Sequence, residues 1–327
     1  MTKLERIIIT RTPIAFFLRK SKHWYLPGFE GAPVFDVIKF FFKQVKTVGL
    51  TERASAIAYN FIMAIPPSFL FLFTLVPNLP FISKLSIKRE LHGLIRDIIP
   101  AKGHNRYLID FVDSFLDDSK IALLSSGLLL ALFFASNAMM GLMRSFNKNY
   151  IGFAKRKDLH NRWTALKLTV IIFLLVLGCL VLLISQGSLL KWIGIKSSTL
   201  REIIFYARWI FIVALIYYSI AFIYKYAPAV EKRWKLLSPG TIIATFLSIL
   251  STISFSYFVN TFGKYNALYG SIGTVIVFMA LVYINSLALL IGFEINVSIK
   301  SLRSLAEKRE IEERAAAATA ATAANLT

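Results

Sequence analysis

Six long apolar stretches dominate the pattern of hydrophobic and polar residues along this chain. They are nearly free of charged side chains, and none alternates polar and apolar positions as a barrel strand does. A helix needs about 20 such residues to cross the roughly 30 Å of hydrocarbon in a membrane. The sequence therefore predicts an all-α, polytopic membrane protein with six transmembrane helices, at about residues 54–82, 121–143, 166–188, 203–225, 237–262 and 268–293.

Amphipathic helices are predicted on both sides of the first span. In residues 84–118, IKRELHGLIRDII and NRYLIDFVDSFLDD repeat apolar residues at helical spacing, separated by Pro100 and Gly103. We expect them to form a helical cap on the outer side. The segment VFDVIKFFFKQVKTV, before the first span, predicts a basic amphipathic helix that lies in the inner interface.

Charged residues are sparse and gather between the apolar stretches. The net charge is +20, and 26 of the 38 lysines and arginines lie in the N-terminal segment, the second and fourth loops and the C-terminal segment. Because basic residues favour cytoplasmic loops, both termini are predicted to be cytoplasmic. The excess positive charge then faces anionic lipid headgroups, and no nucleic-acid partner is expected.

Three regions follow from these patterns. Residues 1–50 are a basic cytoplasmic arm with an interfacial amphipathic helix, and residues 51–300 form the membrane domain. Residues 301–327 begin as a charged cytoplasmic helix and end in a low-complexity tail, whose last dozen or so residues we expect to be disordered.

Residues that could carry catalysis or bind metals are scattered. The four histidines lie in different loops, without HExxH or CxxC spacing, and no phosphate-binding glycine loop is present. The one cysteine, Cys179, lies inside an apolar stretch and has no intrachain partner for a disulfide. We therefore expect no catalytic residue, no metal site and no cofactor, and we do not expect an enzyme.

Uncharged polar residues inside the spans are the candidates for a functional site. Two adjacent prolines in the middle of the first span remove two backbone donors, so the helix is expected to kink or break there. A broken helix at membrane depth is typical of transporter binding sites, but a merely bent helix fits as well. Polar side chains in spans also serve to hold helices together. The polar path that we predict consists of Tyr59, Asn60, Pro66, Pro67, Asn137 and Asn285.

The last span, YNALYGSIGTVIVFMALVYINSLALLIGFEIN, adds two candidate packing features. Gly270 and Gly273 lack side chains, so the fifth and sixth helices are predicted to pack closely near their shared turn. Glu294 lies at the inner end, where Arg144, Arg53 and Lys225 end or begin other spans. We predict that Glu294 forms a charge clamp with one of these three basic residues, and we assign Arg144 and Lys225 to the clamp; a gate is the functional alternative.

Several of these segments resemble one family of bacterial inner-membrane proteins, the YihY/BrkB family. The resemblance rests on ASAIAYNFIMAIPPSFLFLF, MRSFNKNYIG, FIYKYAPAV, LSPGTIIATF and above all the last span, and covers about residues 35 to 300. It implies six spans, cytoplasmic termini and a place in the bacterial cytoplasmic membrane. The family once carried the name ribonuclease BN, now regarded as a misassignment. Its association with virulence and lipid export has led to proposals of transport.

The sequence and the resemblance together favour a carrier or flippase-like transporter of a lipid-related or amphiphilic solute. The alternative is a non-transporting scaffold for envelope partners. A ribonuclease is disfavoured, because RNA hydrolysis normally needs a metal cage or a histidine acid–base pair. Membrane lipids are the expected partners, and a homo-oligomer is compatible with the sequence.

Overall fold

The computed structural model describes residues 24–75, 88–89, 91–93, 95–96, 106, 109–110, 112–113, 121–147, 157–192, 198–230, 233–261 and 265–324. Within these residues it has seven longer helices: α3 (Val34–Val48), α4 (Leu50–Leu75), α7 (Ile121–Phe146), α8 (Asp158–Trp192), α9 (Ser198–Tyr226), α10 (Pro239–Thr261) and α11 (Tyr265–Ala324). The predicted all-α class is confirmed.

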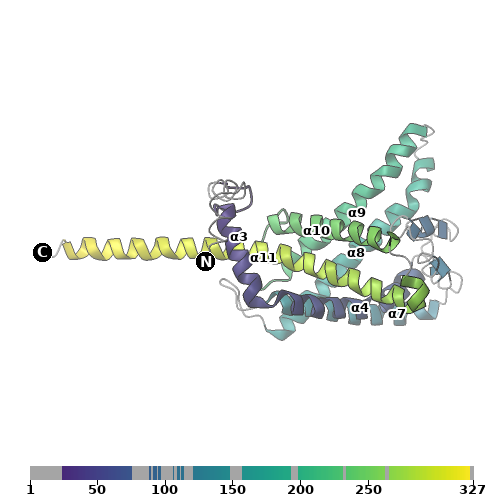
Figure 1. Cartoon of the computed structure of the whole chain (residues 1–327), viewed down its shortest axis with the longest axis horizontal. Coiled ribbons are helices and arrows are strands. Elements are labelled where there is room, and N and C mark those ends of the chain that lie inside the picture. The colour runs from purple at the N-terminus through teal and green to yellow at the C-terminus, as the bar shows by residue number, and fades with distance from the viewer. Residues whose placement is uncertain are drawn as a thin grey trace.

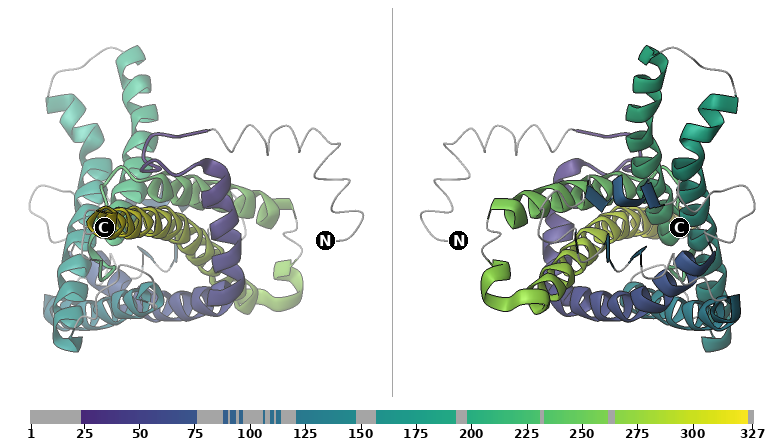
Figure 2. Two further views of the ribbon diagram at one scale, coloured as in Figure 1. Left: turned by 90° about the vertical axis from the view of Figure 1, so that its left-hand side faces the viewer. Right: turned by 90° about the vertical axis from the view of Figure 1, so that its right-hand side faces the viewer.

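Four of the helices pack as two pairs. α4 packs along α7, α10 packs along α11, and the contact between α11 and α4 joins the pairs. α8 and α9 form a hairpin beside them, and its connected ends project beyond the other helices (Figures 1 and 2). We call the end of the bundle from which α11 continues alone to Ala324 the tail end, and the opposite end the far end (Figure 1).

Five of the described helices contain segments long and apolar enough to cross a membrane. These segments are Gly127–Phe146, Asp158–Leu183, Trp209–Tyr226, Pro239–Phe258 and Val275–Ala316. They coincide with the second to sixth predicted spans, so the multi-pass helical membrane character is confirmed. The first predicted span falls on α4, which is not among the five, and the count of six spans stays a prediction.

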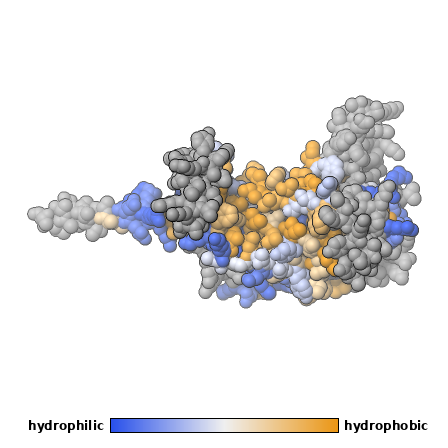
Figure 3. Space-filling model, in the orientation of Figure 1, coloured by the Kyte–Doolittle hydropathy of each residue, from blue (hydrophilic) through white to orange (hydrophobic). Residues whose placement is uncertain are grey.

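Large apolar side chains face outward along the bundle. On α10, Phe246, Ile253 and Tyr257 are exposed, and on α11 Val275 and Met279 are exposed. Figure 3 shows hydrophobic residues gathered over the middle of the molecule, with hydrophilic residues beyond them at the tail end. A contiguous apolar surface of this kind is unfavourable in water but suits contact with lipid chains.

A large cluster of buried apolar residues lies at the tail end. On α7, Met139, Leu142, Met143 and Phe146 are buried at helical spacing, and α11 presents a matching buried stripe of Leu290, Phe293 and Val297. This tail-end core also takes in buried residues of α4, α8, α9 and the α9–α10 connection. The sequence therefore places a shared apolar core where α4, α7, α9 and α11 meet.

α3 lies across α11 at the tail end (Figure 1). Its Val37 is buried in a small cluster with Ile299 of α11, while Ile38 and Phe42 are exposed beside three exposed lysines. A helix therefore occupies the predicted segment, at Val34–Val48, and its place in the membrane interface stays a prediction. Gly49, at a φ of 68°, ends it in a left-handed conformation and lets the chain turn into α4.

Most of the predicted outer cap, residues 84–118, lies outside the described residues. The parts that are described are short helical pieces, in which Asp113 Oδ1 lies 2.9 Å from His92 Nε2 and 3.7 Å from Lys88 Nζ. These contacts join the two predicted cap segments.

The expectation of a disordered tail was wrong. α11 continues as a helix through the charged segment to Ala324. The low-complexity sequence AAAATAATAA is rich in alanine, which has the highest helix propensity of all residues, so low complexity does not prevent a helix here.

Candidate ligand-binding cavity

A cavity of about 640 Å³ lies between the helices, and α4, α7, α8, α9, α10 and α11 all contribute to its wall. It begins beside the tail-end core, at Ile57 and Met139, and extends toward the far end as far as Leu72 and Leu128. We call it the central cavity. Its volume is in the range of pockets that hold small ligands.

The wall of the central cavity is predominantly apolar. Aliphatic and aromatic side chains from every helix cover most of it, among them Phe61, Phe71, Ile172 and Ile216. Among the described residues that line it, none is charged. An ionised group enclosed by such a wall would lose its hydration without gaining a partner, so the cavity suits an uncharged, apolar ligand group.

The polar residues of the wall are few and mostly satisfied within their own helices. They are Ser68, Thr169, Ser219, Ser248, Thr252, Asn285 and Ser286. The hydroxyls of Ser68, Thr169, Thr252 and Ser286 each donate to the carbonyl four residues earlier, at 2.7–2.9 Å. These donors are therefore already used, and the hydroxyls can offer a ligand only their lone pairs.

Of the lining residues that the structure describes, Asn285 alone carries a side-chain amide. Its Nδ2 donates to the Leu281 carbonyl at 3.0 Å and lies 3.4 Å from Thr252 Oγ1 on α10. The amide therefore links α11 to α10 at the cavity surface, in the part of the wall where Ser248, Thr252, Asn285 and Ser286 lie together.

An aromatic layer lies beside the central cavity, toward the tail end. The rings of Phe146 and Phe293 stack with their centroids 3.9 Å apart, and Tyr224 and Trp234 pack against Phe293 at 6.2 and 5.5 Å. The Tyr224 hydroxyl donates to the carbonyl of Leu289, which lines the cavity. Four rings from α7, α9, α11 and the α9–α10 connection thus pack together beside this part of the cavity wall.

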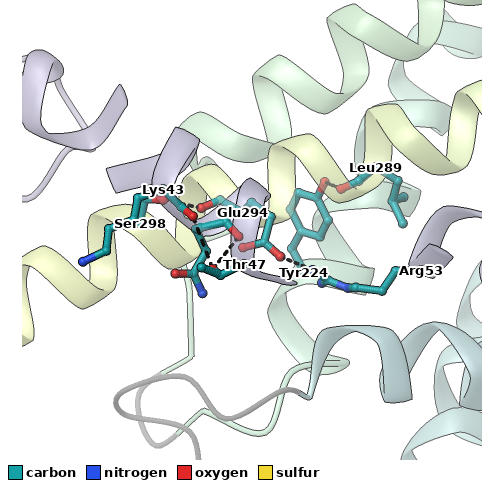
Figure 4. A network of polar contacts seen from close by, with 8 residues as sticks. Lys43, Thr47, Arg53, Tyr224, Leu289, Glu294 and Ser298 are labelled. Carbon is teal, nitrogen blue, oxygen red and sulfur yellow. Dashed lines mark hydrogen bonds and ion pairs between the residues drawn. The ribbon is translucent and has the colours of Figure 1, made fainter. Parts of the chain in front are cut away.

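A buried ion pair lies beside this layer. Arg53 Nη1 of α4 donates to Glu294 Oε1 of α11, and the two side chains are only 5% and 0% exposed. Figure 4 shows the two side chains pointing toward each other next to Tyr224. Arg53 lies one turn from the cavity-lining Ile57 on the same face of α4. The pair therefore ties α4 to α11 at the tail-end side of the cavity.

The α10–α11 contact is closest at a pair of glycines. A Cβ atom added to Gly240 would lie 2.0 Å from the Gly292 carbonyl oxygen, and one added to Gly292 would lie 2.4 Å from the Gly240 carbonyl oxygen. Asn296 of α11 accepts from the Gly240 amide at 2.9 Å and donates to Ser238 Oγ at 2.9 Å. Only glycine at both positions permits this approach of the two backbones.

The structure disperses most of the residues of the predicted polar path. Tyr59 is 61% exposed and faces away from the bundle. The Asn60 side chain lies against α7, where a Cβ on Gly141 would come within 2.6 Å of its Nδ2, and Asn137 accepts from Arg162 Nη1 of α8. Among the three amides, only Asn285 lines the central cavity.

The double proline lies inside a helix that remains continuous. α4 runs from Leu50 to Leu75 with Pro66 and Pro67 within it, so of the two alternatives the structure shows the unbroken helix. The neighbouring residues Ile65 and Ser68 line the central cavity. The carbonyls that the two prolines leave without an amide donor therefore occur at cavity depth.

The structure describes the surroundings of the predicted clamp residues but not those of the two predicted packing glycines. The ion-pair partner of Glu294 is Arg53, the third basic residue considered, while Arg144 is exposed and Lys225 Nζ lies 5.4 Å from the ring centroid of its neighbour Tyr226. Gly270 and Gly273 lie in the first turns of α11, in a part where side-chain surroundings are not described, so their close packing stays a prediction.

Sequence reasoning overlooked the glycine pair at the tail end. Gly240 sits in the motif SPG, which reads as the start of a helix, and Gly292 interrupts an apolar run. The signal that could have identified them is the spacing of Gly292 and Asn296, which places a small residue and an amide on one face of α11.

The fold and the cavity define a multi-pass helical membrane protein whose helices line an apolar cavity. The chain belongs to the BrkB virulence factor family: the sequence profile described as virulence factor BrkB matches residues 41–318.

The chain is also similar to individual bacterial proteins. It is 28% identical over 263 residues to the ribonuclease-like protein YfkH of Bacillus subtilis, which covers 79% of this chain and 92% of that protein. It is 25% identical over 248 residues to a UPF0761 membrane protein of Chromohalobacter salexigens, covering 75% of this chain and 58% of that protein. A third relative, UPF0761 membrane protein IL2447 of Idiomarina loihiensis, is 22% identical over 268 residues, covering 80% and 90%. No solved structure matches the chain.

Proposed function

We propose that the protein is a carrier that moves a lipid-related or amphiphilic solute, with the apolar part of the solute in the central cavity. The observation that carries this proposal is that all six long helices of the bundle line one apolar cavity of about 640 Å³. A protein that served only as a scaffold would gain stability by filling this space with side chains, because protein interiors are normally close-packed.

The chemistry of the wall selects the kind of solute. A hydrocarbon chain needs no hydrogen bonds and gains from leaving water, whereas a charged or sugar-like group would meet an uncharged wall whose donors are mostly used. The few hydroxyl lone pairs and the Asn285 amide suit an ester or hydroxyl near the chain. The wall therefore favours an amphiphile over a small hydrophilic solute.

The membrane arrangement that we propose has six spans, with α4 as the first. The distribution of lysine and arginine places the tail end, both termini and α3 on the cytoplasmic side. The bacterial family supports the cytoplasmic membrane as the location. In this arrangement Ile38 and Phe42 of α3 enter the headgroup region while its exposed lysines meet anionic lipid.

We also propose that the protein is not an enzyme. The word ribonuclease in the name of the B. subtilis relative is not matched by a catalytic constellation: among the described residues no group of three His, Cys, Asp or Glu side chains could hold a metal ion. RNA cleavage by the purified chain, free of contaminating nucleases, would contradict this.

The test of the carrier function is transport in vesicles. The full chain is reconstituted into phospholipid vesicles that contain a fluorescent phospholipid, and its movement between leaflets is followed by a quencher added outside. We expect protein-dependent movement that Ala135→Trp, which fills the cavity wall on α7, reduces at least tenfold. Leu250→Trp adds the same ring at an exposed position of α10 and should leave the rate unchanged. Equal rates for Ala135→Trp and the native chain would refute the use of the cavity.

A further inference from the structure

The Arg53 guanidinium has a second edge that its ion pair does not use. The ion pair with Glu294 is made through Nη1. Nε and Nη2 are buried and have no hydrogen-bond partner in the structure. These two nitrogens form the side-on fork of the guanidinium, whose two parallel N–H groups match two oxygens of one carboxylate or phosphate.

An unused fork at this burial is energetically unfavourable. Buried N–H donors are nearly always paired, and each one left without an acceptor loses its hydration without compensation. Arg53 is 5% exposed, so bulk water does not satisfy it. Glu294 neutralises the charge of the guanidinium but leaves the geometric requirement of the second edge unmet.

The fork is also close to the central cavity. Arg53 and Ile57 are four residues apart on one face of α4, and Ile57 lines the cavity at its tail-end side. A ligand that placed an anionic group at Arg53 would therefore have its remaining atoms beside an apolar chamber. The combination of one buried cationic fork and one uncharged cavity matches the two parts of an anionic amphiphile.

We propose that the Nε–Nη2 edge of Arg53 is an anion subsite that binds a phosphate or carboxylate group, and that the hydrocarbon chain of the same molecule extends into the central cavity. The assignment of the chain rests on the proposed carrier function; the assignment of the anion rests on Arg53 alone. Arginine is required, because lysine has no planar fork and presents only a point charge. The proposed substrate class is thus narrower than amphiphiles in general: it consists of lipids with an anionic phosphate or carboxylate headgroup.

The experiment compares three probes that separate the two parts of the ligand. Phosphatidate has chains and phosphate, diacylglycerol has the same chains without phosphate, and glycerol 3-phosphate has the phosphate without chains. Each is titrated against the full chain in uncharged detergent, and apparent dissociation constants are taken from the rise in unfolding temperature. The variants are Arg53→Lys, which keeps the charge beside Glu294, and the matched control Arg144→Lys at an exposed arginine.

We expect the native chain to bind phosphatidate at least about tenfold more tightly than diacylglycerol. Arg53→Lys should remove most of this preference, whereas Arg144→Lys should retain it. If Arg53→Lys does not yield folded protein, the double variant Arg53→Met with Glu294→Met replaces it, since removing both charges of a buried pair is tolerated far better than removing one.

The outcomes distinguish the subsite from the carrier function. Equal binding of phosphatidate and diacylglycerol by the native chain, or a preference that persists in Arg53→Lys, would overturn the subsite while leaving the carrier function intact. Binding of glycerol 3-phosphate as tight as that of phosphatidate, and lost in Arg53→Lys, would support the anion subsite but assign it to a free anion. In that case diacylglycerol should not bind, and the lipid-carrier function would fail.

Discussion

The buried ion pair between α4 and α11 allows a sharp prediction about stability. Arg53 and Glu294 are 5% and 0% exposed, and the pair joins helices that belong to different packed pairs of the bundle. Glu294→Ala leaves the Arg53 cation buried with no carboxylate in the ion pair. The folded protein should therefore be strongly destabilised, and by far more than a surface substitution would produce.

The magnitude follows from the burial of the pair. Two unit charges about 4 Å apart interact by about 4 kcal/mol at an effective dielectric constant near 20, and removing one partner of a buried pair typically costs about 3–5 kcal/mol. For a chain of this size, such a loss should lower the unfolding temperature by about 4–7 °C. The double variant Arg53→Met with Glu294→Met removes both charges and should lose much less than either single variant.

The assay is thermal unfolding of the detergent-solubilised chain. Glu294→Ala is measured beside a double-mutant cycle that consists of the native chain, Arg53→Met, Glu294→Met and the double variant. The control is Arg314→Ala, which breaks the exposed pair of Arg314 and Glu310, at 78% and 62% exposure, and should have no resolvable effect. A Glu294→Ala unfolding temperature within about 1 °C of the native value would refute the reasoning, because the pair would then behave as a surface pair.

Three further predictions concern packing, the double proline and topology. Gly292→Ala should lower the yield of folded protein, measured by size-exclusion chromatography, because its Cβ would lie 2.4 Å from a backbone oxygen of α10; a native yield would show that α10 and α11 can separate freely. Replacing Pro66 and Pro67 by Ala should leave insertion intact but abolish transport in the vesicle assay, and undiminished transport would show that the prolines only shape packing. Single cysteines introduced at 100–105 should react with an impermeant reagent on intact cells and those at 150–160 should not; the reverse pattern would contradict cytoplasmic termini.

The fold was accessible from the sequence because membrane helices are selected by a simple physical rule. Runs of apolar residues must be helical in lipid to satisfy their backbone groups, so spans two to six could be read from composition alone. The tail differs from its prediction for another reason. Low complexity often indicates disorder, but the residue that repeats in this tail is alanine, which favours a helix.

The site was harder to predict because it depends on how each helix is rotated about its axis. Depth along a helix follows from residue number at about 1.5 Å per residue, which placed Glu294 correctly near a basic residue of another span. Which basic residue Glu294 meets depends on how the helices are rotated and packed. The spacing of residues along the sequence does not determine this rotation, so it cannot decide between Arg53 and Arg144. The same limit explains why Asn60 and Asn137 share a depth with Asn285 but bind different partners.

The cavity itself cannot be predicted from the sequence. Its wall consists of the same leucines, isoleucines and phenylalanines that fill a packed core, and only the distance between helices decides whether they enclose space. The few polar wall residues were visible, but a serine or threonine that bonds its own helix looks the same whether it faces a cavity, a neighbouring helix or lipid.

The central claim, that a lipid chain enters the central cavity, is tested most directly by photo-crosslinking. A phosphatidate with a photoreactive group at its chain end is irradiated with the reconstituted protein, and the labelled residues are identified by mass spectrometry. Thr252 lines the cavity, whereas its neighbour Ile253 is 62% exposed on the outer face of α10. We predict labelling of Thr252 and Asn285 that excess unlabelled phosphatidate suppresses. Labelling confined to outward residues such as Ile253 and Phe246 would contradict the account, because the chain would then touch the protein only from the surrounding bilayer.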